Sequence, residues 1–318
     1  MPFTLAHPAA VLPLLRRGSR LPPEALVAGA MAPDVPFFTG ALAPPTYAAG
    51  RFSHTLGGVV TLDLVLACGL VLLWRWVRLP LLGLLPEPAA GRLAELTRAR
   101  RRPHPLWAAL AAVIGAVTHV VWDDFTHPGR LGSRIFPVLD HPLLGVRLAW
   151  WLQYGTSLAA LVLMAWLLVR ALRQAPTAVV PAAPADPAAP AHPVVPADAV
   201  VHAGPAGAPA ESAAGARTSR RVARPAAARV AGLALLLLAA LGGAAAGWHR
   251  YRTAGGVGST PLDPVSVVSF YTGAAVVCWS VTYAAVVRAA ARTAPDGPQA
   301  RISGRDRREP GSPRDRAA

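Results

Sequence analysis

Histidine and aspartate side chains recur at a one-turn spacing near residue 120 of this chain. His119, Asp123 and His127 follow one another at intervals of four residues, so a helix running through all three would present them on one face. Imidazole nitrogens and carboxylate oxygens are ligands of zinc-type ions, and two such groups one turn apart can bind an ion together. Pro128 and Gly129 predict that the helix ends near His127, which would move that side chain off the shared face.

A structural role is the alternative for this segment. His119 would then pack at the end of a helix, and Asp123 and Asp124 would be hydrated carboxylates at a membrane interface. Arg130 and Arg134 follow closely and could attract an anionic group such as phosphate.

Three further candidates precede the first long apolar segment. His54 stands just before it, where Ser53 or Thr55 can cap the start of a helix. Asp34 lies in a turn between two prolines, and its structural alternative is an Asx turn or a helix cap. His7 directly precedes a proline at a predicted helix start. Each residue has a structural interpretation when taken alone, so a joint site depends on the elements that position them.

Those elements are five apolar segments, each near the length of about 20 residues that a helix needs to cross a membrane. The predicted spans cover residues 59–77, 106–122, 148–169, 227–248 and 265–287. Asp63 lies inside the first span, where a carboxylate is costly and usually faces a protein interior. On a continuous helix it would lie about two and a half turns beyond His54. A structural hydrogen bond is the favoured role for Asp63, and a proton relay is the alternative.

The composition agrees with a membrane protein. Hydrophobic residues make up 53% of the chain and charged residues 15%, with a mean hydropathy of +0.40, whereas soluble domains carry about a quarter charged residues. The formal net charge of +15 comes from arginines that flank apolar segments or lie in a C-terminal tail. This pattern is typical of the positive-inside rule, and no aromatic-basic groove motif accompanies it. We therefore expect the lipid bilayer, and no nucleic acid, as a partner.

We predict an all-α fold, a polytopic membrane helical bundle with about five transmembrane helices and an N-terminal short-helix region. Prolines divide that region into helical pieces at about 8–15 and 23–30 and a loop at 41–50. The predicted organisation is a short-helix region (1–58), the first three spans (59–173), a disordered Ala/Pro-rich linker (174–225), the last two spans (226–290) and a disordered basic tail (291–318).

The arginine distribution predicts the orientation. With the N-terminus outside and five spans, the inner segments carry 22 arginines and the outer segments 9, as the positive-inside rule requires. We expect a multi-pass protein of the cell (plasma) membrane with its N-terminus on the extracytoplasmic side. The second span ends on that side too, so His7, Asp34 and His54 could meet His119 and Asp123 there.

Four motifs in the first half of the chain resemble the DUF4184 family of bacterial membrane proteins. They are Met1-Pro2-Phe3-Thr4 with His7-Pro8, Ala32-Pro33-Asp34, Ser53-His54-Thr55, and Thr118-His119 through Asp123-Asp124-Phe125-Thr126-His127. The same order is similar to the YdjM-like membrane-bound metal-dependent hydrolases and, more remotely, to zinc-dependent phospholipase C and P1 nuclease. The resemblance covers roughly residues 1–170. Residues 52–55 read Phe-Ser-His-Thr, where the hydrolases usually show His-Arg-Gly-x-Thr-His-Ser. One histidine of the hydrolase pattern is therefore replaced in this chain.

The resemblance implies a divalent metal ion, zinc, and a ligand set of His7, Asp34, His54, His119 and Asp123. It further implies that His119 and Asp123 take part in catalysis, in which the ion activates water. The substrate would be a phosphoester or a lipid at the outer membrane face.

Two other functions remain open from the sequence. One is a non-enzymatic membrane protein whose His/Asp cluster is structural. The other is a small transporter with Asp63 as the carrier carboxylate, although the sequence lacks the internal repeat that many transporters have. The hydrolase hypothesis predicts that side-chain atoms of His54, His119 and Asp123 lie within about 5 Å of one another.

Overall fold

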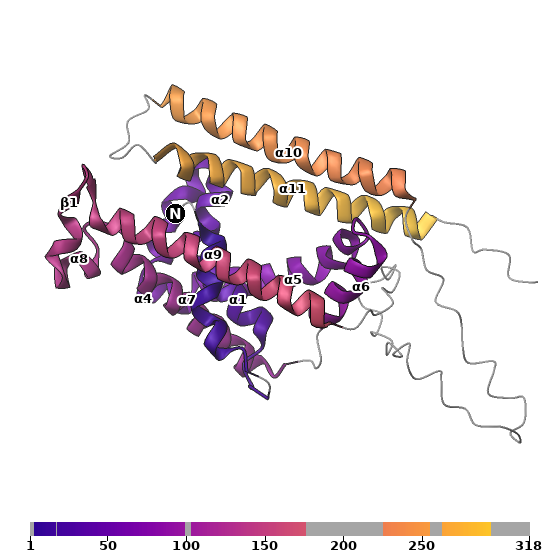
Figure 1. Cartoon of the computed structure of the whole chain (residues 1–318), viewed down its shortest axis with the longest axis horizontal. Helices are drawn as coiled ribbons and strands as arrows, with labels where there is room; N and C mark the ends of the chain where they lie inside the picture. Colours follow the sequence, from indigo (N-terminus) through magenta and orange to yellow (C-terminus); the bar gives the residue numbers. More distant parts are fainter. Residues whose placement is uncertain (1–2, 17, 99–102, 176–224, 255–262, 294–318) are drawn as a thin grey trace, which may run out of the picture.

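The computed structural model describes residues 3–16, 18–98, 103–175, 225–254 and 263–293. Most of these residues are helical, and sheet among them is confined to one two-stranded hairpin (Figure 1). Five helices are long and apolar enough to cross a membrane: α5 (Leu62–Leu82), α7 (Pro105–Thr126), α9 (Leu148–Gln174), α10 (Ala226–Thr253) and α11 (Asp263–Thr293). The predicted all-α, polytopic membrane helical bundle is thereby confirmed.

Short helices occupy the N-terminal region, as its prolines predict. In chain order they are η1 (the 3-10 helix Thr4–Leu14), α1 (Pro23–Met31), η2 (Ala32–Asp34), α2 (Val35–Gly40), η3 (Pro44–Ala48), α3 (Ala49–Ser53) and α4 (Leu56–Val60). The loop predicted over 41–50 was wrong, because η3 and the start of α3 lie there. Pro44 and Pro45 begin η3, since a first helical turn does not need the N–H groups that proline lacks.

The first span begins later than predicted, because the chain breaks at Thr61. This residue has φ −119° and ψ −82°, outside helical values, and separates α4 from α5. Thr55 caps α4, and its hydroxyl accepts a hydrogen bond of 3.0 Å from the Gly58 N–H. His54 ends α3, so no continuous helix joins it to Asp63, and the turn count between them was wrong. The other four long helices contain the segments predicted for them.

Helix α1 packs against α7 and α5, and two glycines bring α1 and α7 close together. A Cβ atom on Gly29 would lie 2.1 Å from the Ala112 carbonyl oxygen, and one on Gly115 would lie 2.3 Å from the Leu26 carbonyl oxygen. Both distances are far shorter than van der Waals contact, so these positions require glycine. Small residues at helix contacts are typical of membrane bundles, where close backbone approach supplies much of the attraction.

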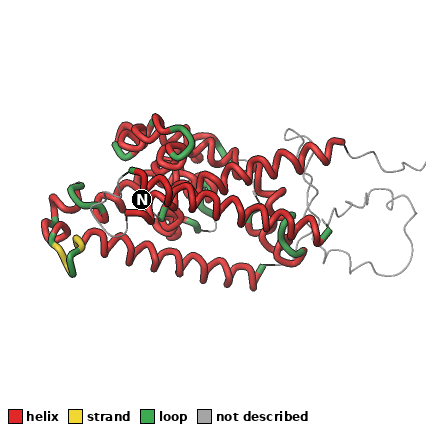
Figure 2. Tube along the Cα trace, turned by 90° about the horizontal axis from the view of Figure 1, so that it is seen from above, coloured by secondary structure: helices red, strands yellow, loops and turns green. Residues whose placement is uncertain are grey.

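Helices α10 and α11 form a pair along one flank of the bundle (Figure 1), and Figure 2 shows that helix dominates the described chain as a whole. Gly243 and Gly247 of α10 allow their close contact, since a Cβ on Gly247 would lie 2.8 Å from the Val268 Cα. Helix α11 also packs on α5 and α2. Phe270 of α11 contacts Phe37 of α2 at a ring-centroid distance of 5.6 Å. This contact joins the last span to the N-terminal region.

Two connections between spans are also ordered. Helix α6 (Glu87–Leu96) follows α5, while α8 (Leu131–Ile135), η4 (Pro137–Asp140) and the hairpin of β1 (Pro142–Leu143) and β2 (Val146–Arg147) join α7 to α9. Leu144 and Gly145 form the hairpin tip, both with positive φ. The predicted linker at 174–225 and basic tail at 291–318 lie almost entirely outside the described residues.

Candidate metal centre

Four side chains from distant parts of the sequence meet inside the bundle. Asp34, His54, His119 and Asp123 are all buried, and each contributes one atom to a group in which all atoms lie within 4.8 Å of one another. Among the described residues this is the cluster with the composition of a metal site. The prediction that side-chain atoms of His54, His119 and Asp123 lie within about 5 Å of one another is confirmed. We call these four residues the His/Asp cluster.

His119 is positioned by the close contact of α1 with α7. Its Nδ1 lies 2.8 Å from the carbonyl oxygen of Ala30, an acceptor, so Nδ1 carries the proton and donates. Nε2 therefore faces the cluster, and it offers a lone pair there when the ring is neutral. This arrangement depends on Gly29 and Gly115, because side chains there would separate the two helices.

His54 is fixed in the same way at the end of α3. Its Nδ1 donates to the Gly50 carbonyl oxygen at 2.8 Å, which leaves Nε2 directed at the cluster. Ser53 supports this turn, since its hydroxyl lies 2.7 Å from the Pro33 carbonyl oxygen and ties α3 to the segment that carries Asp34. A histidine that donates its other ring nitrogen to a backbone carbonyl is the usual arrangement around a protein-bound metal ion.

Asp34 lies at the end of η2, fully buried. The hydroxyl of Thr4 donates to its Oδ2, so Oδ1 remains directed at the cluster. Its side chain does not cap α2, and the structural alternative considered for Asp34 was wrong. Burial favours the neutral acid, but the positive form of His119 outweighs it and lowers the pKa of Asp34 to about 2.

Asp123 connects the largest number of imidazoles. Its Oδ2 lies 3.1 Å from His54 Nε2 and 3.4 Å from His119 Nε2. Its Oδ1 lies 3.7 Å from His7 Nε2 and 3.7 Å from His127 Nδ1. One carboxylate thus joins the cluster to two further histidines.

His7 lies next to the cluster and outside the group of four. Its ring stacks on His119 with centroids 3.7 Å apart and meets Trp122 edge-on at 5.6 Å. Burial, followed by the neighbouring His119, lowers the pKa of His7 to about 3. His7 is therefore a neutral imidazole packed against a cluster member.

The donor atoms match a zinc-type ion in kind, and the carboxylate-to-imidazole separations lie near the spacing that such an ion needs. Tetrahedral bonds of about 2.0–2.1 Å place neighbouring ligand atoms about 3.3–3.4 Å apart. Asp123 Oδ2 lies 3.1 and 3.4 Å from the two Nε2 atoms, and Asp34 Oδ1 lies 3.6 and 3.8 Å from the Nε2 atoms of His119 and His54.

Hydrogen bonding leaves part of this cluster unsatisfied. His119 Nε2, Asp34 Oδ1 and Asp123 Oδ1 are buried without a hydrogen-bond partner among the described residues. Buried polar atoms of this kind are rare and costly, and a cation between two carboxylates and two imidazoles would satisfy those that face the centre. The residues present therefore fit a divalent ion.

The surroundings of Asp63 differ from the prediction. It is fully buried in the first turn of α5, yet neither carboxylate oxygen has a hydrogen-bond partner among the described residues. The structural hydrogen bond expected for it is therefore not found there. Two further aspartates lie near arginines: Asp124 is 3.9 Å from Arg130 and Asp140 is 3.5 Å from Arg147.

Two residues of the site were not assigned roles from the sequence. Thr4, which holds Asp34, carries no signal of its own beyond its place in the Met-Pro-Phe-Thr motif. His127 ends α7 as its C-cap and, as predicted, leaves the helical face of His119. Because the cap lies one turn beyond Asp123, its ring still approaches that carboxylate. Burial, the largest cause, lowers the pKa of His127 to about 4.

The fold and the cluster define the class: a polytopic helical membrane protein with a buried His/Asp cluster between its N-terminal region and its second long helix. A family model for a domain of unknown function, DUF4184, matches residues 1–245. The chain belongs to the DUF4184 family. No curated protein and no solved structure matches it.

Proposed function

We propose that this protein is a metal-dependent hydrolase that binds one Zn²⁺ ion at the His/Asp cluster and cleaves a phosphoester or lipid substrate. The convergence of two imidazole nitrogens and two carboxylate oxygens within 4.8 Å carries the proposal. The resemblance of its sequence motifs to those of the YdjM-like hydrolases supports the reaction class. A bound zinc ion lowers the pKa of a water molecule and polarises a phosphoryl oxygen.

Each residue of the cluster has a separate role in the proposed site. His54 and His119 offer Nε2, held in place by the carbonyls of Gly50 and Ala30. Asp34 offers Oδ1 while Thr4 binds its other oxygen. His119 and Asp123 act in catalysis as ligands that fix the ion next to the cavity lined by His127.

His7 is proposed as a further ligand. Its Nε2 lies 3.7 Å from Asp123 Oδ1, so it can reach an ion through a small shift or hold Asp123 in position. The arginine distribution supports placing the site on the extracytoplasmic side of the plasma membrane.

A structural metal site in a non-enzymatic membrane protein is the second candidate. It is favoured by the burial of all four cluster residues, of which His54 is the most exposed at 8%. Structural zinc sites are closed, whereas catalytic sites keep a position open. The two candidates agree on metal binding and differ on hydrolysis.

Metal analysis of the purified full chain tests both. We expect about one zinc per chain, lost on His119→Ala and retained on His249→Ala, which changes an exposed histidine of α10. No zinc above background in the wild-type protein contradicts both candidates. Zinc-dependent cleavage of a chromogenic phosphodiester, abolished by His119→Ala, supports the hydrolase, and bound zinc without cleavage of any phosphoester offered supports the structural site.

A further inference from the structure

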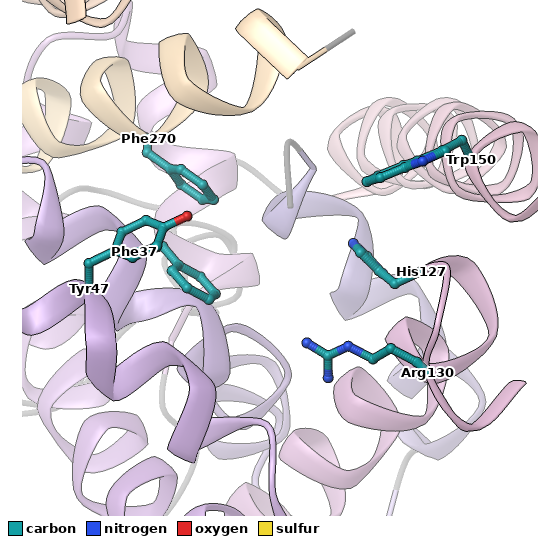
Figure 3. Close-up of a pocket in the computed structure, with 6 residues that line it drawn as sticks. All are labelled: Phe37, Tyr47, His127, Arg130, Trp150 and Phe270. Atoms are coloured by element: carbon teal, nitrogen blue, oxygen red, sulfur yellow. The ribbon is translucent and has the colours of Figure 1, made fainter. Parts of the chain in front are cut away.

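A cleft opens beside the His/Asp cluster. Its inner part is a cavity of about 160 Å³ lined by Phe37, Tyr47, His127, Arg130, Trp150 and Phe270 (Figure 3). A second cavity of about 650 Å³ continues it toward the hairpin, since His127, Arg130 and Trp150 line both. We call the two together the Arg130 cleft. The outer volume lies within the range of about 300–1,000 Å³ typical of ligand sites.

Two walls of the cleft contact the cluster directly. On one side, His127 Nδ1 lies 3.7 Å from Asp123 Oδ1. On the other, the Phe37 ring lies 5.6 Å from the His54 ring. The side chains of His127 and Phe37 therefore lie between a group held in the inner cavity and the residues proposed to bind the ion.

The charge in the cleft is positive. The Arg130 guanidinium points into the inner cavity (Figure 3), and its nearest carboxylate, Asp124, is 3.9 Å away, beyond hydrogen-bond distance. The side chain of Arg130 makes no hydrogen bond among the described residues, so its donors are available to a ligand. Arg147 also lines the outer cavity, where Asp140 lies 3.5 Å from it, so Arg130 is the arginine whose donors remain available. Guanidinium donors match phosphate oxygens in a two-point arrangement.

Apolar residues beside the outer cavity indicate where its ligand comes from. Leu143 and Leu144 at the hairpin are 52% and 85% exposed, and Phe136 and Val138 before it are 52% and 54% exposed. This exposed apolar surface adjoins the end of α7 and the start of α9, where Trp151 is 45% exposed. Tryptophan and apolar side chains at the ends of spans are typical of the membrane interface. The cleft therefore opens at the depth of lipid headgroups.

We infer that the Arg130 cleft binds the phosphate-bearing headgroup of a bilayer lipid, with Arg130 as the phosphate-binding residue. That the bound headgroup is then hydrolysed rests on the proposed function. Its binding depends on the cleft alone. Phe37, Tyr47 and Phe270 form the apolar wall opposite Arg130 (Figure 3).

Equilibrium binding to the full chain in detergent tests the inference, with three probes: dihexanoyl phosphatidic acid, dihexanoyl glycerol and inorganic phosphate. We expect phosphatidic acid to bind most tightly, because it alone offers both acyl chains and phosphate. Arg130→Gln should weaken its binding by about tenfold or more. Arg134→Gln is the matched control, since it removes an exposed arginine of α8 that lines neither cavity.

Three outcomes would overturn the inference: no binding of phosphatidic acid, equal binding by wild-type protein and Arg130→Gln, or inorganic phosphate binding as tightly as the lipid. The last result would identify a soluble phosphate compound as the ligand. Zinc content measured on the same samples keeps the two proposals separate. A wild-type protein without zinc contradicts the hydrolase while leaving the binding result to stand on its own.

Discussion

Two backbone carbonyls determine that Nδ1 carries a proton in both histidines of the His/Asp cluster. The carbonyls of Gly50 and Ala30 each take the Nδ1 proton of one histidine, which leaves both Nε2 atoms facing carboxylate oxygens. Lone pairs facing carboxylates repel one another unless a proton or a cation lies between them. The cluster therefore requires positive charge at its centre, and the geometry offers a metal ion four ligand atoms.

Thr4 should control metal affinity although it does not face the centre. Its hydroxyl orients Asp34, so Thr4→Val leaves Asp34 Oδ2 buried without that donor. We expect zinc affinity to fall by about 10–100-fold, the usual cost of losing such an outer partner. Competition titration with a zinc chelator measures it, with Thr253→Val on exposed α10 as the control. Unchanged affinity in Thr4→Val would show that Asp34 needs no orienting partner.

At the scale of elements, the contact between α1 and α7 decides whether the cluster can form. The carbonyl of Ala30 reaches His119 only because Gly29 and Gly115 let the helices touch. Gly115→Ala should destabilise the protein by about 1–3 kcal/mol, as overpacking does, and weaken metal binding. Thermal unfolding in detergent and zinc content are the measurements.

The control for that substitution is Gly69→Ala in α5. A Cβ there meets nothing within 4 Å, so we expect an unchanged or slightly higher unfolding temperature and full zinc content. Equal effects of the two substitutions would mean that the contact between α1 and α7 does not limit the cluster.

The sequence predicts the side chains of this site better than the backbone that holds them. Spacing and hydropathy identify the long helices and bring His54, His119 and Asp123 to one end of the bundle. The break at Thr61 and the ordered turns around Pro44 are not predicted, because tertiary packing decides which short segments become helical. The carbonyl partners of the histidines are also unpredictable, since every residue has a carbonyl and only packing selects two of them.

At the scale of the whole molecule, orientation can be measured by cysteine labelling. In a background with Cys68→Ser and Cys278→Ser, Leu144→Cys should react with a membrane-impermeant maleimide in intact cells, because Leu144 is 85% exposed at the hairpin proposed to face outward. Glu95→Cys in α6 should react only after the cells are opened. The opposite pattern would place the cluster on the cytoplasmic side.

Metal removal should affect the stability of the whole bundle. The cluster joins the N-terminal region to α7, so a chelator should lower the unfolding temperature of the wild-type protein. Restoring zinc to about 100 times its dissociation constant should return about 2.7 kcal/mol. The His119→Ala variant should unfold at the same temperature with and without chelator, and a chelator effect of equal size in that variant would point to a different site.

The distribution of the cluster along the chain constrains the order in which the protein is assembled during synthesis. Asp34 and His54 are translated before α5, whereas His119 and Asp123 arrive only at the end of α7. Until then the early pair has no partners, and the N-terminal helices lack the surface of α7 on which α1 packs. The four ligand atoms can meet only after the second span has been inserted. The site is therefore completed when the C-terminal end of α7, which carries His119 and Asp123, reaches its side of the membrane. Loading of the proposed metal ion would thus be coupled to membrane insertion, and a chain stalled after α5 would carry an incomplete cluster.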